Sequence, residues 1–349
     1  MNTNPNEIEA KKKALQEAIA RIKKNYGEGS IMILGDTKPV EKVKSISTGS
    51  ILIDSITGIG GIPKGRITEV YGHESSGKTT ICLHIIAEVQ KSGGFAAFID
   101  VEHALDPVYS KSIGVDVANL VVSQPESGEE ALNVVENLIR SNSIDVIVID
   151  SVAALVPKAE ISSDVGDATI GIQARLMSQA LRKIISIVSK TNTAIVFTNQ
   201  LRMKISTGFS YGGPQETTTG GTALKYYASL RIETRKTESI KKGDEVIGMI
   251  CKVKIAKNKV APPFRVADVP ILYGKGISKP YEILTIGPEL GIIKKSGNWY
   301  YYGDDKLGNG IDQALATLEQ KPDLVNKLEV MIRQKLGIEI PDYLKNEKP

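Results

Sequence analysis

The order of apolar and polar positions divides the chain into three stretches of different texture. Residues 5–25 place apolar side chains at helical spacing among lysines. From residue 46 to about residue 234, short apolar runs alternate with longer amphipathic stretches, which is the pattern of strands and helices in turn. Beyond residue 274 an aromatic segment precedes two further helical patterns, at 311–319 and 322–336.

These textures predict three parts. An N-terminal helix with its linker spans residues 1–40, a core domain spans residues 41–273, and a small C-terminal α+β domain spans residues 274–349. The isolated amphipathic helix has no core of its own, so it must dock on its own domain or on a neighbouring molecule. A solvated, charged helix is the alternative interpretation.

The core domain contains five apolar runs with the length and β-branched composition of strands. In the run at 146–150 the first four residues are all apolar, as expected for a parallel strand that is covered on both faces. We therefore predict an open, mostly parallel α/β sheet with helices on both sides, extended by two antiparallel strands at 224–234 and 246–256. The five predicted strands lie at 67–71, 95–100, 120–123, 146–150 and 194–199, and helical patterns at 128–140 and 172–189 lie between them.

Composition and charge narrow the class of protein only slightly. The chain has 349 residues, of which 41% are hydrophobic, so a large core can form. The net charge of +4 is too small to show a polyanionic partner by itself. Cys82 and Cys251 are the only cysteines, and Cys82 lies on the apolar side of a predicted helix, where a buried thiol is expected. The polar start and the lack of an apolar run of about 20 residues predict a cytoplasmic protein with no membrane partner.

One motif carries the most specific chemistry. Residues 72–79 fit the pattern G-x-x-x-x-G-K-[ST], and they follow a predicted strand and precede a predicted helix, as a phosphate-binding loop requires. Backbone N–H groups of such a loop bind phosphate oxygens, while Lys78 reaches the β- and γ-phosphates and Thr79 ligates Mg²⁺. The predicted nucleotide-binding residues of this segment are Gly72, His73, Glu74, Ser75, Ser76, Gly77, Lys78, Thr79 and Thr80.

Polar residues at the ends of the other predicted strands complete this site. Asp150 ends the run at 146–150 and is placed to hold Mg²⁺ with Thr79, although a helix cap is an alternative role. Glu102 lies just beyond another strand end and could polarise the attacking water, or it could form a surface ion pair. Gln200 directly follows the predicted strand at 194–199, and its side chain could contact the γ-phosphate. Tyr109, near the start of a helix, could stack on a purine ring.

Two polar segments follow strands of the core and lack apolar periodicity. One, at 160–171, precedes a helix that carries Arg175 and Arg182. The other, at 201–221, is long and rich in glycine, and such segments are usually functional or disordered. Both leave the edge of the sheet where the predicted nucleotide site lies, so a polynucleotide bound there could communicate with that site.

Together these segments resemble the bacterial RecA recombinases. The resemblance covers essentially the whole chain, and a phosphate loop alone would be far less specific than the combined motifs. Its most specific stretches are 72–79, 98–107, 146–155, 217–221 and 223–231. The resemblance implies a RecA-like P-loop NTPase core that binds ATP and Mg²⁺, an N-terminal polymerisation helix, and a helical filament of identical subunits on single-stranded DNA. It also implies DNA-stimulated ATP hydrolysis, homologous pairing with double-stranded DNA, and strand exchange.

The resemblance also assigns roles to residues. Lys78 and Glu102 would be catalytic, Gln200 would couple the γ-phosphate to the second loop, and Asp106 with Tyr109 would hold adenine. Cations from a neighbouring subunit would complete the site, since the phosphates are not neutralised by one subunit alone. The implied residues of this kind are Lys257 and Lys259 for ATP on the next subunit, Lys225 and Tyr226 for the subunit interface, and Ile170, Arg175, Ser178, Arg182, Met203, Ile205, Gly220 and Gly221 for DNA.

Two departures from the family pattern stand out. His73 occupies a loop position where relatives carry proline, which leaves the backbone cradle intact. The segment 342–349 lacks the acidic tail that is common among relatives, so we expect its truncation to change duplex DNA binding little.

Three functional hypotheses follow. The first is a DNA recombinase that also promotes the self-cleavage of a repressor in the SOS response. The second is a ring helicase built on the same core, and the third is an ATP-switched filament scaffold, a binding role that promotes the self-cleavage of a repressor. The N-terminal helix and the segment 223–231 favour a filament over a ring.

Overall fold

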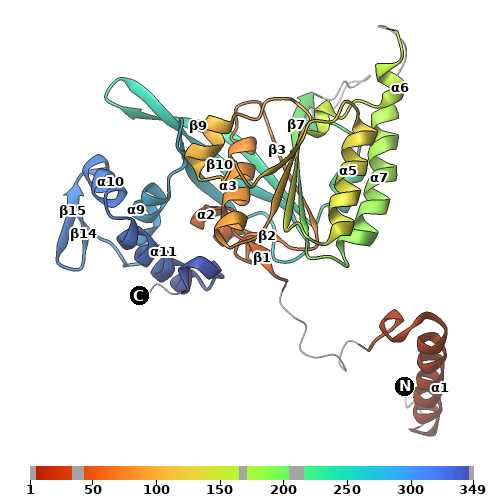
Figure 1. Ribbon diagram of the computed structural model, residues 1–349. Helices are drawn as coiled ribbons and strands as arrows, with labels where there is room; N and C mark the ends of the chain where they lie inside the picture. The colour runs from red at the N-terminus through yellow and green to blue at the C-terminus, as the bar shows by residue number, and fades with distance from the viewer. Residues whose placement is uncertain (1–4, 34–42, 165–170, 204–215, 346–349) are drawn as a thin grey trace, which may run out of the picture. The chain divides into compact units, whose positions relative to one another are not determined.

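The computed structural model describes residues 5–33, 43–164, 171–203 and 216–345 (Figure 1). The chain forms two compact units, residues 1–43 and residues 44–349. The first contains helix α1 (Pro5–Tyr26) and a short 3₁₀ turn, η1 (Glu28–Ser30). No described residue of α1 is buried, and Ile8 and Leu15 are 42% and 57% exposed. This helix therefore carries apolar side chains that its own unit leaves uncovered.

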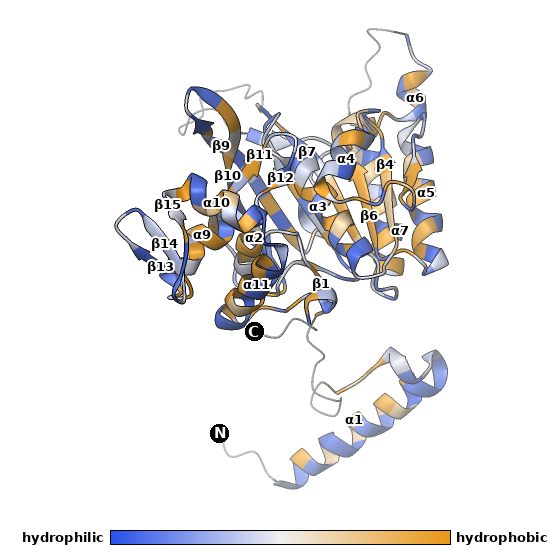
Figure 2. Cartoon of the chain, turned by 60° about the vertical axis from the view of Figure 1, so that its left-hand side comes forward, coloured by the Kyte–Doolittle hydropathy of each residue, from blue (hydrophilic) through white to orange (hydrophobic). Residues whose placement is uncertain are grey.

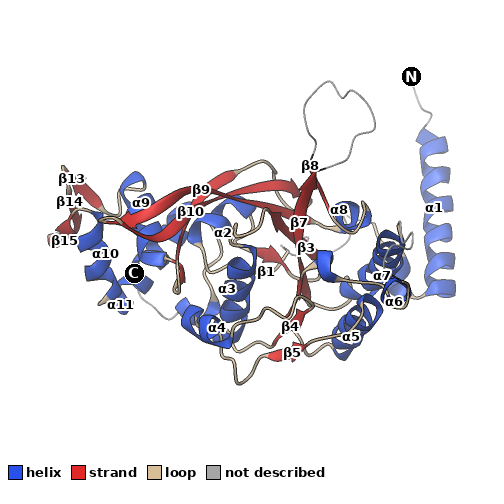
Figure 3. Cartoon of the chain, turned by 90° about the horizontal axis from the view of Figure 1, so that it is seen from above, coloured by secondary structure: helices blue, strands red, loops and turns tan. Residues whose placement is uncertain are grey.

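A ten-stranded sheet forms the centre of the second unit (Figure 3). Its main strand order is β12-β11-β10-β9-β3-β7-β6-β4-β5, and the six strands from β9 to β5 run parallel. The parallel strands are β3 (Ile67–Gly72), β4 (Ala96–Asp100), β5 (Val121–Ser123), β6 (Val146–Asp150), β7 (Ala194–Met203) and β9 (Leu230–Lys242). The antiparallel strands are β10 (Glu245–Asn258), β11 (Val266–Leu272), β12 (Gly276–Ile277) and β8 (Glu216–Thr218), which pairs with the end of β7. The predicted mostly parallel α/β core is confirmed.

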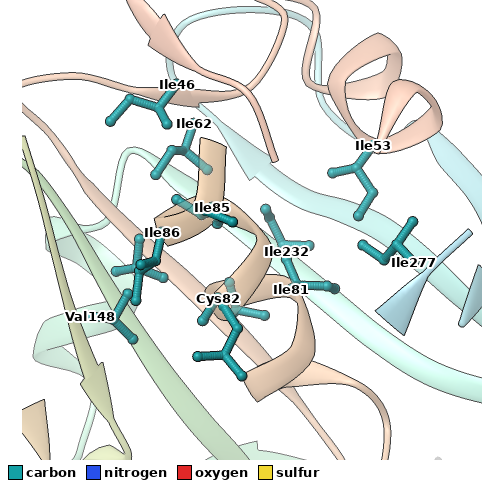
Figure 4. Close-up of a cluster of buried hydrophobic side chains, with 14 of the residues drawn as sticks. Ile46, Ile53, Ile62, Ile81, Cys82, Ile85, Ile86, Val148, Ile232 and Ile277 are labelled. Carbon is teal, nitrogen blue, oxygen red and sulfur yellow. The ribbon is translucent and has the colours of Figure 1, made fainter. Parts of the chain in front are cut away.

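Helices cover both faces of this sheet, as the unbroken apolar strands predicted. Val146 and Val148 of β6 pack on one face with α3 (Lys78–Lys91), and Ile147 and Ile149 pack on the other with α5 (Gly128–Ser141) and α7 (Ile172–Val188). Figure 4 shows the first cluster, where Ile81, Cys82, Ile85 and Ile86 of α3 meet the sheet. In Figure 2 strands β4 and β6 are largely orange, the colour of hydrophobic residues, whereas α5 and α7 show both orange and blue stretches. Alternate strand residues therefore serve two cores.

The C-terminal elements enclose a third hydrophobic cluster. They comprise a helix, a three-stranded antiparallel sheet and two further helices, and Ile51 of α2 (Ile51–Thr57) reaches into the same cluster. The elements are α9 (Lys279–Glu289), β13 (Lys294–Ser296), β14 (Trp299–Tyr302), β15 (Asp305–Asn309), α10 (Ile311–Glu319), α11 (Pro322–Leu336) and the turn η3 (Asp342–Leu344).

A buried network of charges joins these C-terminal elements to the core. Arg333 of α11 donates to Asp54 of α2 at 2.9 Å and to Glu329 at 2.8 Å, and all three side chains are fully buried. Lys279 of α9 contacts the second oxygen of Glu329 at 2.7 Å. Removal of any one of these charges would leave another charge buried and unpaired. A single substitution in the network should therefore destabilise the fold.

The remaining elements are short. A two-stranded antiparallel sheet of β1 (Ser45–Ile46) and β2 (Ile62–Pro63) flanks α2. The others are α4 (Pro107–Ile113), η2 (Val152–Ala154), α6 (Lys158–Ile161) and α8 (Ala223–Tyr227). Among the described helices, none has both the length and the apolar character that a bilayer crossing needs.

The sequence prediction was wrong at one strand and incomplete at another. Residues 224–234 were predicted as a single strand, but residues 223–227 form helix α8 and the strand begins only at Leu230. Strand β7 continues to Met203, beyond its predicted end at Asn199, because β8 pairs with its last three residues. The segment 204–215 that follows β7 lies outside the described residues.

Candidate active site

The phosphate loop joins the end of β3 to the start of α3, at the carboxyl edge of the parallel strands. Gly72 lies beside Gln200 in the register of β3 and β7, and Asp100 lies beside Asp150 in the register of β4 and β6. Parallel strands therefore bring four polar segments to one edge, which is where open α/β sheets bind ligands.

Glycine is required at both ends of this loop. A Cβ on Gly72 would lie 2.2 Å from the carbonyl oxygen of Thr234 on β9, which leaves no space for any other residue. Gly77 has φ of 90°, the left-handed region that favours glycine, directly before the first residue of α3. Close packing below the loop and a sharp turn into the helix thus account for the motif.

Side chains hold the loop from inside. Ser76 donates to the carbonyl oxygen of His73 at 2.7 Å and lies 2.8 Å from the hydroxyl of Thr234. Burial raises the pKa of the Cys251 thiol to about 12, so the thiol stays protonated and donates to the carbonyl oxygen of Ser76 at 3.2 Å. A strand of the antiparallel extension therefore supports the loop, and both cysteines are buried free thiols, as predicted for Cys82.

Lys78 points back over the loop, where its ammonium group donates to the carbonyl oxygen of His73 at 2.7 Å. Burial lowers the pKa of Lys78, and the negative charges of Asp150 and Glu102 oppose that shift. The loop therefore places a cation between its own carbonyl group and two carboxylates, which suits a lysine that binds phosphate as a point charge.

The predicted metal-binding pair is brought together. Thr79 donates to one carboxylate oxygen of Asp150 at 2.7 Å, and Thr198 of β7 donates to the other oxygen. Burial raises the pKa of Asp150, while these two hydroxyl groups stabilise its charged form and lower it. Among the described residues, no group of three His, Cys, Asp or Glu side chains forms a complete metal cage. One hydroxyl and one carboxylate match the way Mg²⁺ binds beside substrate phosphates and water.

The two residues predicted to act on the γ-phosphate also meet. The amide of Gln200 donates to Oε1 of Glu102 at 3.2 Å, and the hydroxyl of Ser151 donates to the same oxygen. Glu102 itself is exposed, on the loop after β4. Asp100 fixes that loop by accepting from the backbone N–H of Ala104 at 3.0 Å and from the Gln124 amide at 2.9 Å.

The two residues predicted to bind adenine, Asp106 and Tyr109, lie at the start of α4. The carboxylate of Asp106 caps this helix by accepting from the backbone N–H groups of Val108 and Tyr109 at 2.8 and 3.2 Å. The half-buried Tyr109 places its hydroxyl 2.9 Å from that of Thr80, the second residue after Lys78. The tyrosine ring is thus tied to the helix that follows the phosphate loop.

The predicted subunit-interface residues form a second cluster on α8. The ammonium group of Lys257 donates to the carbonyl oxygens of Lys225 and Tyr226 at 2.7 and 2.9 Å, and Lys259 donates to that of Tyr226 at 3.2 Å. Burial and the neighbouring charges of Lys259 and Arg231 lower the pKa of Lys257 to about 8. These residues lie together in one protomer, on a different segment from the phosphate loop.

The predicted DNA-binding residues are partly described. Arg175, Ser178 and Arg182 share one side of α7, at positions i, i+3 and i+7, and both arginines are exposed. Met203 is 60% exposed at the end of β7. Ile170 and Ile205 lie outside the described residues.

The glycine pair has a steric basis. Gly220 and Gly221 both adopt left-handed φ values, of 76° and 78°. A Cβ on Gly220 would lie 2.6 Å from Val152, and one on Gly221 would lie 2.7 Å from Ala174 of α7. The chain therefore crosses tightly over η2 and α7 at this point.

His73 contacts the far side of the glycine-rich segment. Its Nε2 lies 3.3 Å from a carboxylate oxygen of Glu216, the first residue of β8. The departure from proline therefore adds a side-chain link, while the backbone carbonyl of His73 still receives Ser76 and Lys78.

Sequence reasoning missed the residues that orient this site. Ser151, Thr198 and Thr234 carry hydroxyl groups that contact Glu102, Asp150 and Ser76, and Asn199 is fully buried beside Gln200. Part of the signal was present, because Ser151 directly follows β6 and Asn199 directly precedes Gln200. Their partners, however, depend on strand register, which the pattern does not give.

The chain matches known proteins over nearly all of its length. The pattern of the RecA N-terminal domain matches residues 13–278, and that of the RecA C-terminal domain matches residues 281–337. Relatives that carry the name Protein RecA include the following three. The one from Bacteroides thetaiotaomicron is 58% identical over 327 residues, covering 94% of this chain and 98% of the relative. The one from Thermotoga maritima is 54% identical over 337 residues, covering 95% and 94%. The one from Symbiobacterium thermophilum is 54% identical over 331 residues, covering 94% of each.

These matches cover the phosphate loop and the strands that carry Asp150 and Gln200. The chain therefore belongs to the RecA family, the DNA-dependent P-loop ATPases that recombine DNA.

Proposed function

We propose that the cluster at the carboxyl edge of the sheet is the catalytic centre of an ATP-dependent DNA recombinase. Membership of the RecA family supports this activity, which we propose to be homologous pairing and strand exchange by a filament on single-stranded DNA, with DNA-stimulated ATP hydrolysis. The convergence of Gln200 and Ser151 on one oxygen of Glu102, beside the Thr79–Asp150 pair, is the observation that supports these residue roles.

In this proposal the loop holds the triphosphate of ATP. Backbone N–H groups of residues 72–79 and the ammonium group of Lys78 bind the β- and γ-phosphates, helped by the N-terminus of the 14-residue helix α3. Thr79 and Asp150 are the residues that fit Mg²⁺, which when bound would neutralise charge on the phosphates. Tyr109 and Asp106 hold the adenine ring.

Glu102 orients and polarises the water that attacks the γ-phosphate. Its exposed position gives water access, and the Ser151 hydroxyl fixes the orientation of its carboxylate. Gln200 reports the state of the γ-phosphate to the glycine-rich segment, since it lies on the strand that leads into that segment.

A second protomer completes the site. Lys257 and Lys259 supply positive charge to ATP bound on a neighbouring copy, and Lys225 with Tyr226 lie in the same interface. Helix α1 docks its apolar positions on another protomer, which would cover Ile8 and Leu15. Head-to-tail contacts of this type do not close, so they produce a helical filament rather than a ring.

DNA binds to the residues around the two polar segments. Arg175 and Arg182 are exposed on one side of α7 and would contact phosphates of single-stranded or double-stranded DNA, together with Ser178, Gly220 and Gly221. Apolar Met203, Ile170 and Ile205 would contact bases. Binding of this kind tolerates any sequence and weakens with salt, so base pairing tests homology.

We further propose three parts for the chain, residues 1–40 for docking, 41–273 for ATP hydrolysis and DNA binding, and 274–349 as the C-terminal domain. The protein would work on chromosomal DNA in the cytoplasm. It would also promote self-cleavage of a repressor in the SOS response.

The decisive test is ATP turnover by the purified chain with and without single-stranded DNA, followed by exchange of a homologous and of an unrelated duplex. We expect DNA to stimulate hydrolysis and only the homologous duplex to exchange. DNA-independent hydrolysis without exchange would instead favour a ring helicase or a scaffold, and micrographs with ATP and DNA would separate ring from filament. Incubation of the filament with an SOS-type repressor tests the cleavage role, which the absence of any cleavage would reject.

A further inference from the structure

A buried asparagine on β7 hydrogen-bonds both to the neighbouring Gln200 and to Thr219, the residue that precedes the glycine pair. Asn199 is a fully buried residue of β7, directly before Gln200. Its carbonyl oxygen accepts from the backbone N–H of Gln200 at 2.9 Å and from the hydroxyl of Thr219 at 2.6 Å. Its amide nitrogen donates to the carbonyl oxygen of Thr219 at 3.1 Å and to Oε1 of Glu69 at 3.0 Å.

These four bonds use the full hydrogen-bonding capacity of the asparagine amide. A primary amide has two N–H donors and two acceptor lone pairs, so Asn199 can take only one orientation here. An aspartate at this position would face the carboxylate of Glu69, and a leucine would leave several buried groups unpaired. The side chain is thus a rigid connector between Gln200 and Thr219.

The connector rests on a buried ion pair. Glu69 of β3 is fully buried, and its second oxygen accepts from Nε of Arg231 on β9 at 2.5 Å. The Arg231 guanidinium group lies 4.3 Å from the centre of the Tyr71 ring, so it is held on a second side. Removing either charge would leave the other buried and unpaired. The ion pair therefore fixes the Glu69 carboxylate that accepts from the Asn199 amide.

Both ends of the connector lead to functional segments. On one side, the backbone of Gln200 is fixed while its side chain contacts Glu102. On the other side, Thr219 precedes Gly220 and Gly221, and helix α8 begins at Ala223, two residues further on. The connector therefore joins the γ-phosphate sensor to the base of a predicted DNA-binding segment.

We propose that Asn199 is a positioning residue that transmits the state of bound nucleotide from Gln200 to Thr219, and so to the DNA-binding segment. The inference rests on the proposed function, because it needs Gln200 to contact nucleotide and Gly220 to contact DNA. Since Asn199 bonds the backbone of Gln200 and both polar groups of Thr219, movement of Gln200 displaces Thr219 with it.

The test uses Thr219→Val, which removes one hydroxyl group and keeps the shape of the side chain. Thr219→Ser restores the hydroxyl. Thr222→Val is the matched control, since the Thr222 side chain makes no capping hydrogen bond to α8. For each full-length variant, the Kd for a labelled single-stranded oligonucleotide is measured with ADP and with a slowly hydrolysed ATP analogue. The ratio of the two Kd values measures the coupling between nucleotide and DNA.

We expect Thr219→Val to reduce this ratio by about tenfold, the scale of one buried hydrogen bond, while Thr219→Ser and Thr222→Val stay within about twofold of wild type. A simple structural role would instead weaken DNA binding equally with both nucleotides, which would overturn the inference. An unchanged ratio in Thr219→Val would overturn it too. If wild-type protein itself shows no effect of nucleotide on DNA affinity, the proposed function fails rather than this inference alone.

Discussion

The hydroxyl group of Thr79 donates to the carboxylate of Asp150 at 2.7 Å, although the two residues come from different strand–helix units. One ends the phosphate loop and the other ends β6, two strands away in the sheet. This contact already holds the two groups that fit a Mg²⁺ ion next to each other in the protein without nucleotide. The protein therefore aligns these two groups through its own hydrogen bond.

Replacement of Lys78 by alanine should remove productive ATP binding. The positive charge held between the His73 carbonyl and two carboxylates would be lost, and the triphosphate would meet Asp150 and Glu102 without compensation. We expect DNA-stimulated turnover to fall by about 100-fold or more, the scale of losing a preorganised charge partner. Lys91→Ala, at the other end of α3, is the control. Strand exchange by Lys78→Ala with ATP at the wild-type rate would rule out this site.

Replacement of Glu102 by glutamine should separate assembly from hydrolysis. The amide keeps a group that can contact Ser151 and Gln200 but cannot act as a base, so turnover should fall by roughly 10²–10⁴-fold. Filaments on single-stranded DNA should still form with ATP, as seen in micrographs. Glu289→Gln, an exposed carboxylate on α9, serves as the control. Undiminished hydrolysis would show that another group activates the water.

Lys257 should make filament assembly sensitive to pH. Its pKa is lowered to about 8 in the protomer, and a neighbouring triphosphate would raise it, so assembly would take up a proton. ATP-dependent assembly should therefore weaken as the pH rises through about 8. Lys257→Arg, which stays charged, should remove this dependence. Light scattering between pH 7 and pH 9 measures it, and equal pH dependence in both proteins would contradict the proposed role.

Glu282 should make stability fall as the pH rises. Burial raises its pKa from 4.5 to about 8, where it accepts from Ser50 and from the backbone N–H of Ile51. The folded state therefore holds a proton that the unfolded state releases, so this contribution is complete below about pH 4.5 and is lost on approaching pH 8. Glu282→Gln should lack that loss. Urea unfolding of both proteins at pH 6 and pH 9 gives the comparison.

Other groups titrate in both proteins, so the comparison uses the difference in the free energy of unfolding between variant and wild type, and asks how that difference changes between pH 6 and pH 9. The variant should be more stable relative to wild type at pH 9 than at pH 6, so that its free energy of unfolding minus that of wild type is larger at pH 9. An equal difference at both values would mean that Glu282 is not protonated in the folded state.

The strands of the core were predictable because their composition is unambiguous. Residues 146–149 are all apolar, and only a strand buried on both faces needs that pattern. Helix α8 was missed because its five residues are too few to show helical periodicity, and Leu224 and Leu230 look like parts of one apolar strand. Local pattern thus predicts long elements and fails for short ones.

The site was predictable as far as local motifs reach. The loop at 72–79 carries its own geometry, and Asp150 follows from the end of an apolar strand. The contacts of Ser151 and Asn199 were not predictable, since each depends on which residues of neighbouring strands face each other, such as Gly72 and Gln200. Register is a property of the assembled sheet rather than of any one segment.

The ion pairs between Arg333, Asp54 and Glu329 have a consequence for work at different ionic strengths. Ions in solution screen exposed charges far more than buried ones, and these three groups are closed to water. Concentrated salt should therefore release a polyanion from the exposed arginines of α7, while the ion pair between Arg333 of α11 and Asp54 of α2 stays intact. Dissociation from DNA at high salt would then report on the binding surface alone, with the remainder of the ATPase unit unaltered.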